Sequence, residues 1–222
     1  MFTFNRRMSC VLSLLCFTLL ACGGGKGGSS DKGPSAYEEL SGLSTSLQNK
    51  LDETTAPINE SDAIIQEFTE LPKTLEMKTE DFKTFIISAI QGEMKVPEGT
   101  SAKAAGQLMA FGLKFTAFKD NLMATPDRST ELVKQIAVTL TKVPVLVTKV
   151  EASAKLTKNN PFASKKEKTE ASKQSEGAKS MGDDTTKKVT EIQKTAQELP
   201  GKATASISKF LGALKGVGID NL

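Results

Sequence analysis

Apolar residues recur at steps of three and four along most of the chain after residue 35, which is the spacing of helices that bury one face. Ser35 and Glu38 form a capping-box pair before the first series, Leu40, Leu43, Leu47 and Leu51. This series predicts a helix that ends near Thr54. Pro57 is expected to open a second helix, and Pro72 to kink or stop it.

Thr79 is expected to cap a third helix, with an apolar face of Phe82, Phe85, Ile86, Ala89 and Ile90. Residues 96–99, Val-Pro-Glu-Gly, then predict a loop. The clearest helical segment of the chain follows, with a heptad seam of Leu108, Phe111, Phe115, Phe118 and Leu122. Thr125 and Pro126 predict the cap and first-turn proline of a further helix.

That further helix would bury Leu132, Ile136, Leu140, Val143, Val147 and Val150. Ile136, Val138 and Leu140 also alternate as in a strand, and Pro144 weakens both readings. Because the three-four spacing persists over the longer window, we expect a helix kinked at Pro144.

Asn159-Asn160-Pro161 breaks the pattern, and residues 163–184 are rich in lysine, serine and glutamate. Such a stretch is either a long solvated helix or disordered. Weak periodicity returns and is expected to stop at Leu199-Pro200-Gly201. A last stripe, Ile207, Phe210, Leu211 and Leu214, would dock on the bundle or, less favourably, lie on a membrane surface.

These patterns predict an all-α fold, an antiparallel and elongated bundle of five to seven helices. We expect a bundle core in residues 35–158, a polar linker, helical or disordered, in 159–184, and C-terminal helices in 185–222. Residues 22–34 are dominated by glycine and serine, which predicts a flexible tether in front of the bundle.

The first 22 residues hold a basic pair, Arg6 and Arg7, an apolar segment from Val11 to Leu20, and then Ala21 and Cys22. The run Leu19-Leu20-Ala21-Cys22 resembles the lipobox of bacterial lipoproteins. This resemblance implies that residues 1–21 are a signal peptide and that Cys22 is lipidated and held in a membrane. With Gly23 after the cysteine, it implies an outer-membrane anchor facing the periplasm.

The amino-acid composition limits the catalytic and metal-binding chemistry that this protein can perform. The chain has no histidine, and its three cysteines, Cys10, Cys16 and Cys22, all precede residue 23. Histidine- and cysteine-based catalysis and histidine-liganded zinc are therefore excluded from the body. We expect no enzyme activity and no cofactor. Basic clusters interleaved with aromatics are lacking, so we expect no nucleic-acid partner.

Charge is unevenly distributed along the chain. Residues 38–98 hold 13 acids and 5 lysines, whereas residues 101–150 hold 7 basic residues and 3 acids. Residues 151–209 hold 12 basic residues and 8 acids. This asymmetry predicts charge matching between helices that fold back on each other, in preference to a charged partner.

Two groups of residues are candidate sites. Phe111, Phe115 and Phe118 would line a pocket for an acyl chain or, more commonly for such a stripe, form the bundle core with help from the small Gly106 and Gly112. Asp183-Asp184 would bind a hard cation only with further oxygen donors, so a helix break or cap is favoured.

Two functions therefore remain open. The favoured one is a non-enzymatic lipoprotein of the cell envelope that acts as a scaffold or binds a partner protein. The alternative is a binder or carrier of lipid or another hydrophobic ligand, which would use the phenylalanine seam.

Overall fold

The computed structural model describes residues 35–219 and shows four helices there and no strand. Their bounds are α1 Ala36–Thr74, α2 Thr79–Ile90, α3 Ala102–Asn159 and α4 Lys165–Gly216. The expected all-α class is confirmed for this part of the chain. The expected signal peptide, the whole of the expected tether and residues 220–222 lie outside the described residues.

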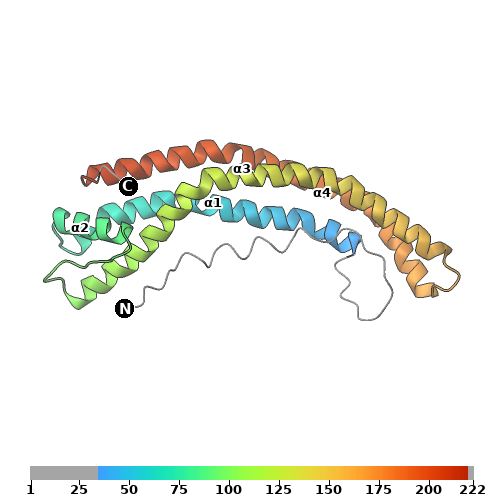
Figure 1. The fold of residues 1–222 in the computed structure, drawn as a ribbon, viewed down its shortest axis with the longest axis horizontal. Helices are drawn as coiled ribbons and strands as arrows, with labels where there is room; N and C mark the ends of the chain where they lie inside the picture. The colour runs from blue at the N-terminus through green and yellow to red at the C-terminus, as the bar shows by residue number, and fades with distance from the viewer. Residues whose placement is uncertain (1–34, 220–222) are drawn as a thin grey trace, which may run out of the picture. The chain divides into compact units, whose positions relative to one another are not determined.

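Helices α1, α3 and α4 lie side by side, and the short α2 packs at one end of them (Figure 1). Helix α3 runs antiparallel to both others. Its Lys114 pairs with Glu67 of α1 at 2.5 Å, while Lys50 of α1 donates to Gln135 farther along α3 at 2.6 Å. At 1.5 Å per residue, the 58 residues of α3 extend over about 87 Å.

The expected number of five to seven helices is wrong, because helices continue through prolines that were expected to separate them. These are Pro57 inside α1, Pro126 inside α3 and Pro200 inside α4. Pro72, which was expected to kink or stop a helix, lies two residues before the end of α1, and Pro144, which was expected only to kink one, lies inside α3. Each interior proline removes one backbone hydrogen bond and costs roughly 3 kcal/mol. Ending a helix there would also interrupt the packing of its buried face, which continues on both sides.

The buried face of α3 explains this continuity. Its buried positions alternate in steps of three and four without a break through both prolines, at residues 108, 111, 115, 118, 122, 125, 129, 132, 136, 139, 143, 146 and 150. Pro126 and Pro144 fall between these seam positions, and Pro144 is exposed. Residues 132–150 are therefore helical, and the strand interpretation is wrong.

Three prolines lie at a common level of the bundle. Pro57, Pro126 and Pro200 each fall between two core clusters, one rich in phenylalanine and one built around Leu51, Leu132 and Leu199. Buried residues at this level are small or polar: Thr54, Ser61, Thr125, Ser129, Ala203 and Ser206. Each of the three helices lacks a backbone hydrogen bond at this level because of its proline. The helices can therefore bend there together and stay in contact.

Helices α3 and α4 form a hairpin that extends beyond the start of α1. Ala36 packs beside Val147 and Met181, so within residues 35–219 the later part of α3 and the earlier part of α4 pair with each other alone (Figure 1). The expected break after Asn159 is confirmed. Residues 165–184 are helical, and α4 passes through the expected boundary at 184 without a break.

Capping boxes start both α1 and α4. Ser35 donates its backbone N–H to Glu38 at 2.7 Å and accepts from the Glu38 N–H, and Ser164 and Glu167 repeat the arrangement. The Ser35 N–H holds the pKa of Glu38 below its usual value. This support is present above the ordinary carboxyl pKa and is lost as the pH falls through the lowered one.

The expected charge matching is found in ion pairs between helices. Glu67 and Asp62 of the acidic α1 pair with Lys114 of α3 and Lys209 of α4, the latter at 3.1 Å. All of these side chains are well exposed, so each pair contributes little to stability and chiefly favours the observed arrangement.

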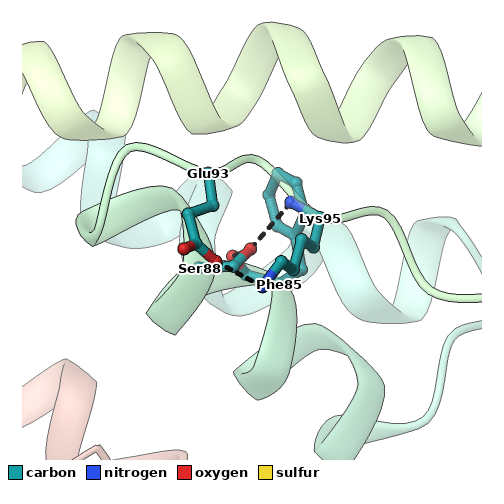
Figure 2. Close-up of polar contacts among 4 residues, drawn as sticks. All are labelled: Phe85, Ser88, Glu93 and Lys95. Carbon is teal, nitrogen blue, oxygen red and sulfur yellow. Dashed lines mark hydrogen bonds and ion pairs between the residues drawn. The ribbon is translucent and has the colours of Figure 1, made fainter. Parts of the chain in front are cut away.

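A buried serine ties the loop after α2 to its helix, as Figure 2 shows. The Ser88 hydroxyl donates to the Phe85 carbonyl at 2.8 Å and accepts from the Lys95 N–H at 2.9 Å. Glu93 and Lys95 form an ion pair at 2.5 Å on the outside of the same turn. The loop is thereby held against α3, where Met94 and Phe85 meet Gly112.

Gly112→Ala is expected to lower the free energy of unfolding by about 1–3 kcal/mol, because the new methyl overpacks this contact. A Cβ at Gly112 would lie 2.8 Å from both the Met94 sulfur and the Phe85 ring. Gly106→Ala is the matched control on the same helix. It meets nothing within 4 Å and should gain roughly 0.5–1 kcal/mol of helix propensity. Urea unfolding of both variants measures the difference, and equal gains would contradict the close packing.

Candidate interaction surface

The phenylalanine seam of α3 lies inside the largest core cluster. Phe111, Phe115 and Phe118 are 2%, 0% and 4% exposed. The ring of Phe115 lies 5.5 Å from that of Phe68 of α1 and 5.4 Å from that of Phe210 of α4. These are the distances of favourable aromatic pairs, so the seam joins three helices.

The C-terminal stripe packs on this cluster. Phe210 and Leu214 are 1% exposed, and Ile207 and Leu211 are partly buried beside them. Phe210 also meets Phe118 edge to face at 5.4 Å. The docked interpretation of this stripe is therefore correct, because its apolar face is turned into the protein.

Asp183 and Asp184 lie in the middle of α4, so the expected helix break or cap is wrong. Each precedes a lysine by four positions, Lys187 and Lys188, which is a favourable spacing on a helix. Both carboxylates are exposed. In residues 35–219 no three His, Cys, Asp or Glu side chains come close enough together to hold a metal ion.

A groove of about 750 Å³ runs between α1 and α4. Its walls carry mainly uncharged polar side chains, and Leu51 and Ile192 contribute buried apolar surface: the lining is Ser44, Thr45, Gln48, Asn49, Leu51, Asp52, Thr55, Ala56, Asn59, Lys188, Glu191, Ile192 and Thr195. Gln48 donates to Asp52 at 2.8 Å, which fixes both side chains along the groove wall.

The lining of this groove is suited to contact with another protein. It offers hydrogen-bond donors and acceptors in a row, with a short apolar floor and only a few charges. Small side chains such as Ser44, Thr45 and Ala56 allow another backbone to approach. An added helix that lies along α1 and α4 would bury the floor and find polar partners at the rim.

A smaller groove lies between α1 and α3 beside the phenylalanine cluster. Phe118 and Pro57 line it, together with the charged residues Glu53, Glu60, Lys114 and Arg128. The charged lining does not favour an acyl chain, because burying an apolar chain beside these groups would also strip them of water.

Cys22, the expected lipidation site, lies outside the described residues. Among the helices of residues 35–219, none combines the length and the apolar character that crossing a bilayer requires. No family model, curated protein or solved structure matches the chain.

The sequence correctly predicted that the three seam phenylalanines share one buried helix face, but it did not predict the groove between α1 and α4. The signal for α4 was present, because its buried residues follow a heptad pattern made largely of small side chains: Ala178, Gly182, Thr185, Val189, Ile192, Ala196, Leu199, Ala203, Ser206 and Phe210. A search restricted to large apolar residues overlooks such a seam, and with it the parallel α1–α4 pair that forms the groove.

Phe115→Ala is expected to cost about 3–5 kcal/mol of unfolding free energy, because it leaves a cavity among three helices. Phe162→Ala is the matched control, since that ring is 94% exposed and its loss should leave stability nearly unchanged. Denaturant unfolding compares the variants, and lipids extracted from each are assayed in parallel. A small change at Phe115 together with lost lipid would instead assign the seam to ligand binding.

Proposed function

We propose that this chain is a lipid-anchored protein of the bacterial cell envelope that acts as a non-enzymatic scaffold and binds a partner protein through the α1–α4 groove. The anchoring part rests on the resemblance of residues 19–22 to a lipobox and on the basic and apolar segments before it. Cys22 would be the lipidated residue, and Gly23 favours the outer membrane, with the body in the periplasm.

The groove between α1 and α4 is the observation that supports partner binding most. It is open, lined mainly by uncharged polar groups and floored by Leu51 and Ile192. A partner helix in this groove would turn the three-helix bundle locally into a four-helix one, which is a common packing for helices of this length.

Lipid carriage is the less favoured function. The rings that would hold an acyl chain, Phe111 and Phe115, contact each other and their neighbours on α1, α2 and α4. A lipid would have to separate these helices and replace their mutual contacts before it gained any of its own.

Cys22→Ser tests the anchor. In cells labelled with a fatty acid, the parent protein should incorporate label and sediment with membranes, whereas the variant should lose the label and either be released or stay unprocessed. Ser29→Ala in the same tether is the control and should behave as the parent. Persistent labelling of the Cys22→Ser protein would contradict lipidation at this residue.

A photo-crosslinking amino acid at Thr45 tests the groove. We expect a defined adduct with one envelope protein, identified by mass spectrometry and then purified for direct binding. Thr141, which is exposed on α3, is the matched control position and should give no such adduct. Thr45→Arg should then weaken binding of the purified partner by about tenfold or more, because a bulky charge fills the groove. Equal crosslinking from both positions would contradict a specific role of the groove.

A further inference from the structure

The turn between α3 and α4 exposes an aromatic ring. Phe162 is 94% exposed, and Leu156, about one helical turn before the end of α3, is 74% exposed. By contrast, the phenylalanines that make up the largest core cluster are at most 4% exposed. Phe162 and Leu156 are the two most exposed of the large apolar residues in the described part of the chain, so they are the ones most available to contact another surface.

This turn is held by local hydrogen bonds. The Phe162 N–H donates to the side-chain oxygen of Asn160 at 2.9 Å, and the Ala163 N–H donates to the Asn160 carbonyl at 3.2 Å. The Ser164–Glu167 capping box then starts α4 at once. The ring therefore lies on a hydrogen-bonded turn between the end of α3 and the start of α4.

Lysines outnumber acids in the sequence on both sides of the ring, and Lys166, Glu167 and Glu170 line the hollow beside it. Residues 155–168 hold five lysines, at 155, 158, 165, 166 and 168, and a single acid, Glu167. The Glu167 carboxylate accepts the Ser164 N–H at 2.7 Å and so is engaged in the cap, and Glu170 is the next acid along α4. All of these lysines except the half-buried Lys168 are exposed.

The tip also lies at the end of the bundle where the tether joins. Helix α1 begins beside Val147 and Met181, and the hairpin extends from there to Phe162, roughly 20 Å at 1.5 Å per residue. Thirteen peptide steps separate Cys22 from Ser35. Such a chain spans up to about 45 Å when extended and about 20 Å on average if it behaves as a flexible glycine-rich linker.

We propose that the α3–α4 tip docks on an anionic phospholipid surface, with Phe162 inserted at the headgroup level and the lysines among the phosphates. We take this surface to be the membrane that holds the lipid anchor, which rests on the proposed lipidation of Cys22. One ring and Leu156 offer far less than the roughly 1,000 Å² that a stable protein interface requires. A membrane needs only a short apolar insertion and a basic rim.

Phe162→Trp gives a direct test, because the chain has no other tryptophan. The protein is the chain from residue 22 onward with Cys22→Ser, so the result does not depend on lipidation. Vesicles with about 30% phosphatidylglycerol in phosphatidylcholine should shift the tryptophan emission to shorter wavelength and allow quenching by brominated lipids. Leu113→Trp, at a 64% exposed site on the opposite half of α3, is the matched control and should not respond.

Binding to the same vesicles is then measured by sedimentation. Phe162→Ser should weaken it by about tenfold or more and the pair Lys165→Gln, Lys166→Gln by a similar factor, whereas Leu113→Ser should not change it. Raising the salt to about 0.5 M should weaken the parent's binding strongly. Circular dichroism checks that each variant keeps its helices.

Unchanged emission of the Phe162→Trp protein with saturating anionic vesicles would overturn the proposal, as would equal binding to pure phosphatidylcholine. A crosslink from position 162 to an envelope protein without lipid quenching would assign the tip to a protein instead. Absence of fatty-acid labelling at Cys22 of the parent protein in cells would be a separate result and would bear only on the proposed anchor. A positive vesicle result would stand without it.

Discussion

The whole body depends on heptad packing that runs without interruption along three helices. On α3 every seam position from Leu108 to Val150 is buried, and on α4 the seam continues from Ala178 to Phe210. Each large apolar side chain in such a seam stabilises by about 1.5–3 kcal/mol, and several lie between successive prolines. This sum exceeds the roughly 3 kcal/mol that one proline costs, so the helices continue where local signals predict an end.

The sequence predicted those features that large apolar residues and caps determine locally. The start of α1 at the Ser35 cap, the start of α2 to within one residue, the phenylalanine seam and the break after Asn159 all belong to this class. The number of helices was predicted wrongly because proline is a local signal. Whether a helix continues past a proline depends on its packing against the neighbouring helices. The helical state of residues 165–184 was left open because Ala171, Ala178 and Gly182 give a weak hydropathy signal, although they pack well against α3.

Side-chain size falls along the bundle from the α2 end to the hairpin tip. Phenylalanines fill the first cluster, and leucine, isoleucine and valine fill the second and third. Where α1 begins, a Cβ on Gly182 would lie 2.6 Å from Val147, and in the two-helix part beyond it the buried residues include Ala154 and Ala171. Apolar area buried per residue falls in the same direction, so local opening should begin at the hairpin. Between the first two clusters, the buried Ser61 hydroxyl has no hydrogen-bond partner among the described residues, which makes the proline level a second weak place.

The proposed membrane contacts reinforce each other through chain length. A tip with one aromatic ring and five lysines would bind a surface weakly by itself, but the proposed anchor at Cys22, 13 residues before Ser35, would make the second contact intramolecular. The effective concentration over so short a tether is on the order of millimolar, so even a weak contact would be occupied for much of the time. With the tip on the membrane, the α1–α4 groove would face the space beside the bundle and the phenylalanine core would be held farthest from the lipid. Anchor and tip together would then orient the groove toward a partner, which an anchor alone would not do.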